Sequence, residues 1–261
     1  MRNQLLVILM IALGFRIQAQ HRLQCDGVGN TYDICSDHLA KHSSSFNIDY
    51  RLSTLQYGTS AQLDLTNPLV PFLFFPDQGS LVFFDNNLNV LEDPIFLNEK
   101  FQGQITCVAG SKGDAFWMFE ANSSTLIRTN RKFEILSKSA NLSVLTKHTV
   151  QPFQIIENGQ RVYVFEANQG ISVFSLFGNL ETVSTFYTMD PVQQWNNFIY
   201  FRFGNMLYEW ENTTPEPKRI AYLDTKELRQ KDWTICEGKP YFVEPKSGEK
   251  EEIPVIENFE K

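Results

Sequence analysis

Strand-like runs recur in pairs along this chain, with a spacing of roughly forty residues between pairs. Each pair begins with an apolar, aromatic run and continues, after a short polar turn, with a second apolar run. The aromatic runs cover residues 71–75, 114–119, 161–165 and 197–201, and their partners cover 80–84, 125–128, 171–174 and 206–210. A fixed period built from several short strands is typical of sheets arranged around an axis. The repeat therefore predicts an all-β fold, a β-propeller of four-stranded blades.

The number of blades follows from the aromatic residues that close the equivalent strands. Phe75, Phe119, Phe165, Phe201 and Phe242 occupy similar places in five units, and the turns after Phe119 and Phe165 both begin Glu-Ala-Asn. A further unit is expected upstream, from the segments 30–35 and 52–56. The sequence thus predicts six blades, with five as the alternative.

Composition supports a large β domain and limits the partners. The chain has 261 residues, of which 43% are hydrophobic, and its 22 Phe favour strands. The net charge is −7 and the pI is about 5.2. Nucleic acid and anionic lipid surfaces require dense Lys/Arg patches, so neither is an expected partner.

The N-terminus has the features of a targeting segment. Arg2 supplies a positive charge, Leu5 to Phe15 is an uninterrupted apolar run of eleven residues, and Ala19 offers a small residue for cleavage. Eleven residues span only about half of a ~30 Å hydrocarbon core, so a cleaved signal is favoured over a short membrane anchor. No later run is long enough to cross a membrane. We expect an extracytoplasmic mature protein, periplasmic or secreted, that begins near Gln20.

These features divide the chain into four expected parts. They are a signal peptide at 1–19, an N-terminal segment at 20–45, the propeller at 46–250 and an acidic tail at 251–261. Within the N-terminal segment, the polar stretch 36–45 is expected to form a helical turn or a loop.

Several segments resemble known six-bladed propellers. The Glu-Ala-Asn turns and the turn Phe177-Gly-Asn-Leu180 resemble blades of the NHL and TolB-like groups. The segments 63–68, 72–75 and 81–88 are similar to those of a family of secreted propeller proteins from Gram-negative bacteria. The resemblance covers about residues 50–245. It implies a six-bladed fold and says little about function, because propellers host binding, scaffolding and catalysis alike. The family supplies no catalytic residues that could be carried over to this sequence.

Few residues are arranged for chemistry. His38 and His42 have the spacing of a zinc pair on a helix, but the Glu of the metalloprotease motif and a third ligand are missing, so exposed side chains are the favoured interpretation. Five carboxylates recur near strand ends, where turns need short polar residues in any case: Asp77, Asp85, Asp93, Glu120 and Glu166. We therefore assign no catalytic residue, no metal ligand and no cofactor.

Four cysteines allow three pairings in an oxidising compartment. Cys107 and Cys236 precede equivalent aromatic strands in units three apart, which face each other across a six-bladed ring, so both are expected to be buried free thiols. Cys25 and Cys35 are expected to pair across a short loop that contains Gly27 and Gly29. The alternative to this pair is that Cys25 and Cys35 both remain free thiols.

Two functions remain. The favoured one is a non-catalytic extracytoplasmic propeller, a binding or scaffold module whose partner is a protein or glycan of the bacterial envelope. The alternative is a hydrolase or lyase with its site at the mouth of the propeller channel. The two are distinguished by whether acidic or histidine side chains converge on that mouth.

Overall fold

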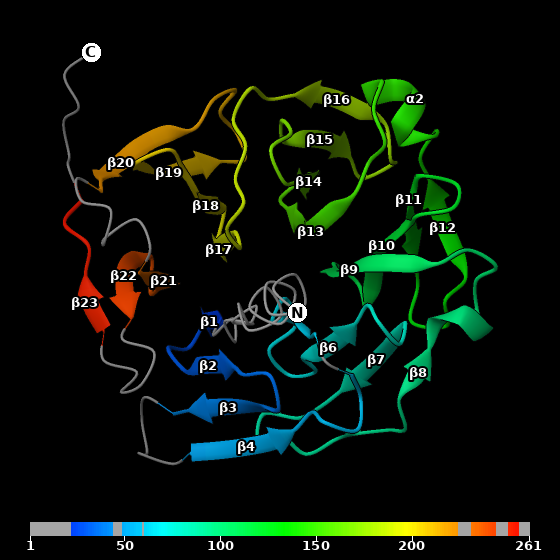
Figure 1. Cartoon of the computed structure of the whole chain (residues 1–261), viewed down its shortest axis with the longest axis horizontal. Coiled ribbons are helices and arrows are strands. Elements are labelled where there is room, and N and C mark those ends of the chain that lie inside the picture. Colours follow the sequence, from blue (N-terminus) through cyan, green and yellow to red (C-terminus); the bar gives the residue numbers. More distant parts are fainter. Residues whose placement is uncertain (1–21, 44–48, 59, 224–230, 244–249, 256–261) are drawn as a thin grey trace, which may run out of the picture.

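The computed structural model contains six β-sheets arranged as blades around a central axis (Figure 1). It describes residues 22–43, 49–58, 60–223, 231–243 and 250–255. The expected signal peptide at 1–19 lies outside these residues. The predicted all-β, six-bladed propeller is confirmed.

Each blade is an antiparallel meander in which the strands follow one another from the axis outward. Blades 1 to 3 consist of β1 (Arg22–Cys25), β2 (Thr31–Ile34), β3 (His38–His42) and β4 (Asp49–Ser53); β5 (Gln62–Asp64), β6 (Phe72–Phe75), β7 (Ser80–Phe83) and β8 (Ile95–Phe96); and β9 (Ile105–Ser111), β10 (Ala115–Glu120), β11 (Thr125–Thr129) and β12 (Ile135–Lys138). A short 3-10 helix, η1 (Leu97–Glu99), follows blade 2.

Blades 4 and 5 repeat this plan, whereas blade 6 has three strands among the described residues. The strands are β13 (Pro152–Asn158), β14 (Arg161–Glu166), β15 (Ser172–Ser175) and β16 (Leu180–Val183); β17 (Gln193–Trp195), β18 (Phe198–Phe203), β19 (Met206–Glu211) and β20 (Lys218–Tyr222); and β21 (Asp232–Cys236), β22 (Lys239–Val243) and β23 (Lys250–Glu252). A helix of five residues, α2 (Leu142–Thr146), joins blades 3 and 4, and Asn141 caps it by accepting from the Val144 N–H.

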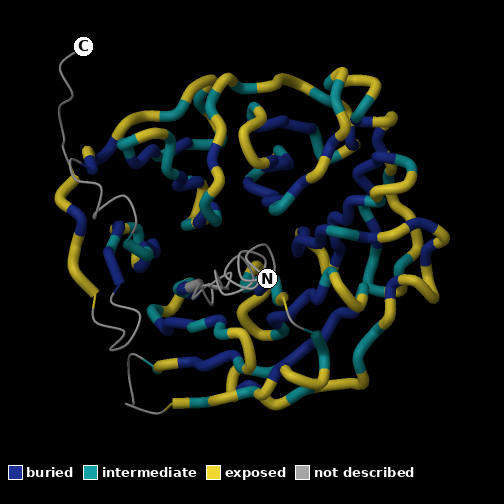
Figure 2. Tube along the Cα trace, in the orientation of Figure 1, coloured by how far each residue is buried: buried dark blue, intermediate teal, exposed yellow. Residues whose placement is uncertain are grey.

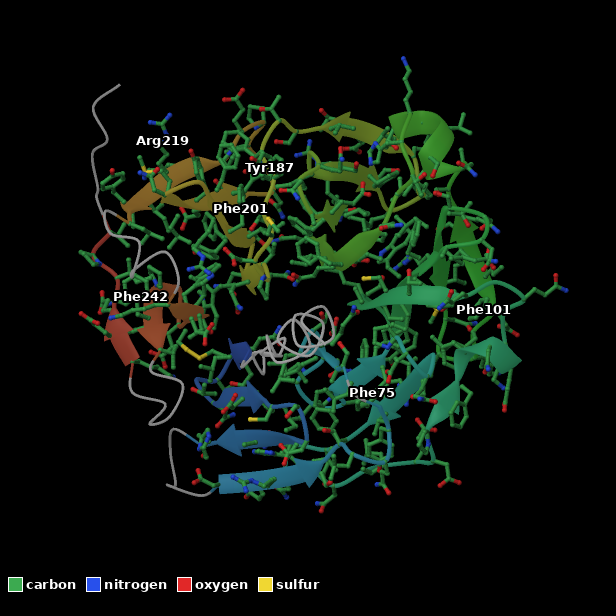
Figure 3. All side chains as sticks on the ribbon, viewed as in Figure 1. Phe75, Phe101, Tyr187, Phe201, Arg219 and Phe242 are labelled. Carbon is green, nitrogen blue, oxygen red and sulfur yellow. A yellow bond between two sulfur atoms is a disulfide. The ribbon has the colours of Figure 1, made fainter. Side chains whose placement is uncertain are left out.

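Burial falls from the second strands of the blades to the outermost ones (Figure 2). All four residues of β6 are buried, whereas three of the four residues of β12 are exposed. A strand that is apolar on both faces must be covered on both sides, and here the neighbouring blades cover it. The aromatic residues that marked the repeat are accordingly buried in the second strands; Phe75, Phe201 and Phe242 are labelled in three different blades in Figure 3.

Five of the six junctions between blades contain a cluster of buried apolar side chains. These clusters join blades 1 and 2, 2 and 3, 3 and 4, 4 and 5, and 5 and 6. Within the described residues, no such cluster spans blades 6 and 1. We call this sixth junction the seam.

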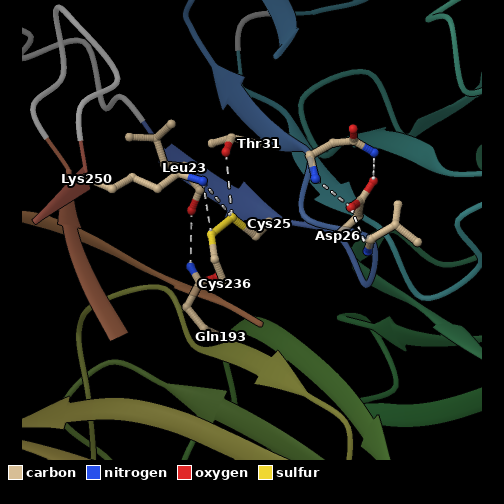
Figure 4. Close-up of a disulfide and its surroundings, with 9 residues drawn as sticks. Leu23, Cys25, Asp26, Thr31, Gln193, Cys236 and Lys250 are labelled. Atoms are coloured by element: carbon tan, nitrogen blue, oxygen red, sulfur yellow. Dashed lines mark hydrogen bonds between the residues drawn. A yellow bond between two sulfur atoms is a disulfide. The ribbon is translucent and has the colours of Figure 1, made fainter. Parts of the chain in front are cut away.

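A disulfide closes the seam. Cys25 at the end of β1 is bonded to Cys236 at the end of β21, with their Cα atoms 5.3 Å apart and 211 residues between them in sequence (Figure 4). The Lys250 ammonium group lies 3.5 Å from Cys25 Sγ and 3.4 Å from Cys236 Sγ. Beside the seam, Gln193 of blade 5 donates to the Leu23 carbonyl of blade 1 at 3.3 Å. Among the described residues, the seam is thus held by the disulfide and by polar contacts.

The expected pairing of Cys25 with Cys35, with Cys236 as a buried free thiol, is therefore wrong. Sequence reasoning placed Cys236 opposite Cys107 across the ring, which is consistent with blades 6 and 3. It did not compare Cys236 with Cys25, because β1 was not recognised as the first strand of a blade. In a closed ring the first and last blades are neighbours, so their inner strands come within disulfide distance.

The propeller also begins earlier than expected. β1, β2 and β3 form a sheet with β4, so most of the predicted N-terminal segment, 20–45, belongs to blade 1. The stretch 36–45 contains β3 rather than a helical turn. At the other end, β23 takes residues 250–252 into blade 6, and Ile253 packs into the cluster between blades 5 and 6, so the acidic tail also starts later than expected.

Removing the disulfide should destabilise the whole ring. We expect Cys25→Ser and Cys236→Ser to lower the free energy of unfolding by about 3–5 kcal/mol, because the cross-link closes a very long loop in the unfolded chain. Urea unfolding of the oxidised proteins measures this change. Cys35→Ser is the control and should leave the midpoint unchanged; equal midpoints for all three variants would contradict the assignment of the seam.

Candidate functional site

The central channel contains a cavity of about 300 Å³. Its lining comes from β1, β5, β9, β13 and β17, from residues that adjoin these strands, and from Ile34 of β2. Three carboxylates contribute to this lining, Asp26, Asp64 and Glu157, from blades 1, 2 and 4. The described residues around the cavity include no Lys, Arg or His. The cavity is therefore acidic, as is the chain.

Glu157 connects blade 4 to blade 3. Its Oε2 accepts from the Trp117 indole N–H at 2.7 Å and from the Ser111 hydroxyl, and its Oε1 accepts from the Lys112 backbone N–H at 3.1 Å. The side chain is 7% exposed. Hydrogen bonds from three donors offset the cost of burying this carboxylate and fix β13 against β9.

Asp64 makes the corresponding contact between blades 2 and 3. Its Oδ2 accepts from the Gly110 N–H at 2.7 Å, and its Oδ1 accepts from the Thr66 N–H at 2.9 Å. Burial raises the pKa of this carboxyl group above its usual range, although both backbone hydrogen bonds act in the opposite direction. A Cβ on Gly110 would lie 2.8 Å from Asp64 Oδ1, so glycine allows this close approach.

Asp26 instead organises the turn of its own blade. Its carboxylate accepts from the N–H groups of Val28 (3.0 Å) and Asn30 (2.9 Å), and from the Asn30 side-chain amide at 2.6 Å. The Tyr32 hydroxyl lies 3.4 Å away, and burial together with the nearby Asp26 raises the pKa of that phenol. The three channel carboxylates thus all serve as acceptors for neighbouring backbone or side chains.

Amides and two aromatic residues complete the lining. Gln154 exchanges two hydrogen bonds of 2.8 Å with the backbone of Val192, which ties blade 4 to blade 5. Gln194 and Asn196 are exposed at the mouth, and Trp195 between them lies against the β21–β22 turn. A Cβ on Gly238 in that turn would be only 3.1 Å from the Trp195 indole nitrogen. This rim offers amide donors and acceptors beside an indole.

The carboxylates expected from the sequence do not line this cavity. Glu120 and Glu166 end the second strands β10 and β14, and Asp77 follows β6, so these three lie at the opposite end of their blades from Asp64 and Glu157. Asp85 forms a turn by accepting from the N–H groups of Asn87 and Asn89, while Asp93 lies exposed in the same connection.

Glu120 and Glu166 also have partners of their own. Glu120 accepts from the Ser123 hydroxyl and pairs with Lys138 at 3.3 Å, and the Ser123 bond is the main reason that the pKa of Glu120 is lowered. Glu166 accepts from the Gln151 N–H at 2.7 Å and lies 3.0 Å from His148 Nε2. They hold turns and do not converge with one another in a cavity.

The histidine pair lies on a strand rather than a helix. His38 and His42 are the two ends of β3, about 13 Å apart at the usual rise per residue. Each has its own carboxylate: His38 Nδ1 lies 2.6 Å from Asp37, and His42 Nδ1 lies 2.8 Å from Asp49. The described residues contain no group of three or more side chains placed to hold a metal ion.

The two cysteines outside the disulfide differ in exposure. Cys107 is fully buried in β9, where burial raises the pKa of its thiol to about 12. Cys35 is partly exposed, and burial together with Asp33 raises the pKa of its thiol to about 11. Neither thiol is activated, since a raised pKa disfavours the thiolate at neutral pH.

The channel carboxylates were missed because no local motif marks them. One signal could have identified them: the repeat itself, since Asp64 and Glu157 lie in the last residues of an inner strand and Asp26 follows one directly. Residues at that position meet around the axis. Sequence reasoning instead examined the second strands, which carry the stronger aromatic pattern.

Comparison with solved structures supports the fold. A streptogramin B lyase superposes with a TM-score of 0.60 and 10% identity over 94% of this chain and 86% of that one. A catalytically inactive virginiamycin B lyase from Staphylococcus aureus with quinupristin gives a TM-score of 0.59 and 12% identity over 90% and 84%. BamB from Moraxella catarrhalis gives 0.51 and 7% identity over 92% and 84%.

Such low identities establish a shared architecture alone. The chain is a six-bladed β-propeller, the architecture implied by its resemblance to the NHL and TolB-like groups. No known family model matches the sequence, and no curated protein resembles it in sequence. Among the described residues, no helix is long and apolar enough to span a membrane.

A stability measurement tests the structural role of Glu157. We expect Glu157→Ala to lower the free energy of unfolding by about 3 kcal/mol, because the Trp117, Ser111 and Lys112 donors would lose their buried acceptor. The matched control is Glu181→Ala, which removes a carboxylate from the half-exposed pair with Arg161 and should cost less than about 1 kcal/mol. Equal losses in chemical denaturation would contradict this role.

Proposed function

We propose that the protein is a non-catalytic extracytoplasmic binding propeller that holds a protein or glycan of the cell envelope at its channel mouth. The observation that carries this proposal is the lining of the 300 Å³ cavity. Asp64 and Glu157 accept hydrogen bonds that join neighbouring blades, and Asp26 accepts them within its own blade, while Gln194, Trp195 and Asn196 lie at the rim.

The rim chemistry suits such a partner. Amide side chains both donate and accept hydrogen bonds, as sugar hydroxyls and peptide groups require, and an indole provides a flat apolar surface beside them. The acidic lining disfavours anionic partners by repulsion. These properties support recognition of a neutral or cationic polar partner.

The disulfide supports a location outside the cytoplasm. Disulfides persist in oxidising compartments and are rare in the cytosol, and the bond between Cys25 and Cys236 closes the ring. The apolar run before Ala19 supports export independently.

A hydrolase or lyase at the channel mouth is the second candidate, and one observation favours it. Asp26, Asp64 and Glu157 converge on the cavity, and the raised pKa of Asp64 is a property that general acids share. Against it, each of the three already accepts hydrogen bonds from at least two donors. None of the histidines in the described part of the chain lies at the cavity to act as a partner base.

Export predicts a shortened protein in the native host. We expect the mature N-terminus at or next to Gln20, because the small Ala19 follows the apolar run. Intact-mass measurement of the protein purified from its host checks this. A mass that includes residues 1–19 would contradict it and favour a retained N-terminal anchor.

Binding is tested by capture from the host's solubilised envelope with the purified mature protein as bait. We expect a partner that the wild type retains and that Trp195→Ala and Gln194→Ala retain at least about fivefold less, because a rim aromatic and its amide neighbour carry the contact. Leu55→Ala is the control, since this exposed side chain follows β4 at the other end of the blade.

Mass spectrometry of the captured partner distinguishes the binding propeller from the hydrolase or lyase. An unchanged partner supports binding, and a cleaved one supports the hydrolase or lyase. Equal capture by wild type and both rim variants would contradict the channel mouth as the site.

A further inference from the structure

A second cavity, of about 210 Å³, lies between blades 2 and 3. It opens near the ends of β5, β7 and β9, and Asp64, Thr66 and Gly110 line both this cavity and the channel. Cavities for drug-sized ligands are roughly 300–1,000 Å³, so this one suits a smaller molecule.

Three aromatic rings give the cavity an apolar wall. Phe72, Phe83 and Phe116 lie with centroids 5.6 to 5.9 Å apart, and Phe72 and Phe116 meet edge to face at 79°. All three are buried in the cluster that joins the two blades, so their positions are fixed by packing. A small apolar group in the cavity would therefore meet a preformed surface.

The guanidinium group of Arg131 lies beside this aromatic wall. The Arg131 guanidinium carbon lies 3.6 Å from the Phe83 centroid, and its Nη2 donates to Glu92 at 2.6 Å. Stacking and the Glu92 contact hold the guanidinium plane in place. The group has five N–H donors, and the bond to Glu92 uses one, so the others can bind a ligand carboxylate.

Two carboxylates line the same cavity. Asp64 reaches it from the end of β5, and Asp114 from the β9–β10 turn. Asp64 has no cationic partner among the described residues, and burial raises its pKa. It accepts backbone hydrogen bonds from Gly110 and Thr66 and a side-chain hydrogen bond from Thr66, all from neutral donors. An ammonium group here would supply the missing positive charge.

We propose that this cavity binds one free α-amino acid with an apolar side chain. The ligand's ammonium group lies against Asp64 and Asp114, its carboxylate lies against Arg131, and its side chain packs on the Phe72, Phe83 and Phe116 rings. The cavity therefore requires a ligand that carries an ammonium group and a carboxylate on one small molecule. A free amino acid has both groups, whereas a peptide end or a simple amine has only one of them. The proposal does not rest on the partner proposed for the channel mouth, although the two cavities share Asp64, Thr66 and Gly110.

Calorimetric titration of the oxidised mature protein tests the site with a series of leucine analogues. L-Leucine should bind with one-to-one stoichiometry. L-Leucinamide lacks the carboxylate, N-acetyl-L-leucine lacks the ammonium group and glycine lacks the side chain, so each should bind at least about tenfold more weakly. This series uses the unmodified protein, so it does not depend on the folding of any variant.

Two variants then assign the charges. Arg131→Gln should weaken leucine about tenfold while leaving leucinamide unchanged, because the amide has no carboxylate to lose. Asp114→Asn should weaken leucine and leave N-acetyl-leucine unchanged; Asn tolerates the positive φ of 51° at this turn. Arg161→Gln is the matched control, since it breaks the comparable exposed pair with Glu181 away from the cavity, and it should bind leucine as the wild type does.

Three results would each overturn the proposal. They are no binding of leucine or phenylalanine at about 10 mM, equal affinity for leucine and leucinamide, and unchanged leucine affinity in a folded Arg131→Gln variant. None of them bears on capture at the channel mouth, which is tested through Trp195.

Discussion

Closure of the ring at the seam is the constraint on which the rest of the structure depends. Each blade is apolar on both faces, so an open arc of six blades would leave two such faces in water. Apolar clusters close five junctions, and the Cys25–Cys236 bond closes the sixth. The two cysteines end the inner strands β1 and β21, so the bond joins the first and last blades near the axis.

The same principle explains the channel carboxylates. Inner strands from different blades meet around the axis, and their last N–H groups need acceptors once water is partly excluded. Asp64 and Glu157 accept from backbone N–H groups at the end of β9, each from a different neighbouring blade. Polar groups near the axis therefore act as structural contacts, which leaves the rim for the binding that we propose.

The sequence predicted the parts of the fold that repeat and missed those that do not. Phe75, Phe119 and their equivalents recur in strands buried on both sides, so the period predicted the blades and their number. Blade 1 was only partly recognised, because Ile34 takes the place of the phenylalanine and β3 lies in the polar stretch 36–45, which suggested a helical turn or a loop. The disulfide and the channel site join residues far apart in the chain. Their proximity follows from ring closure, which no local pattern records.

Amide hydrogen exchange of the Cys25→Ser/Cys236→Ser double variant tests the central claim most directly. If the disulfide holds the seam between blades 6 and 1, protection should fall more in β1, β2, β21 and β22 than in β9, β10, β13 and β14, where only the loss of global stability acts. An equal loss of protection in all six blades, or no loss at β1 and β21, would contradict the account.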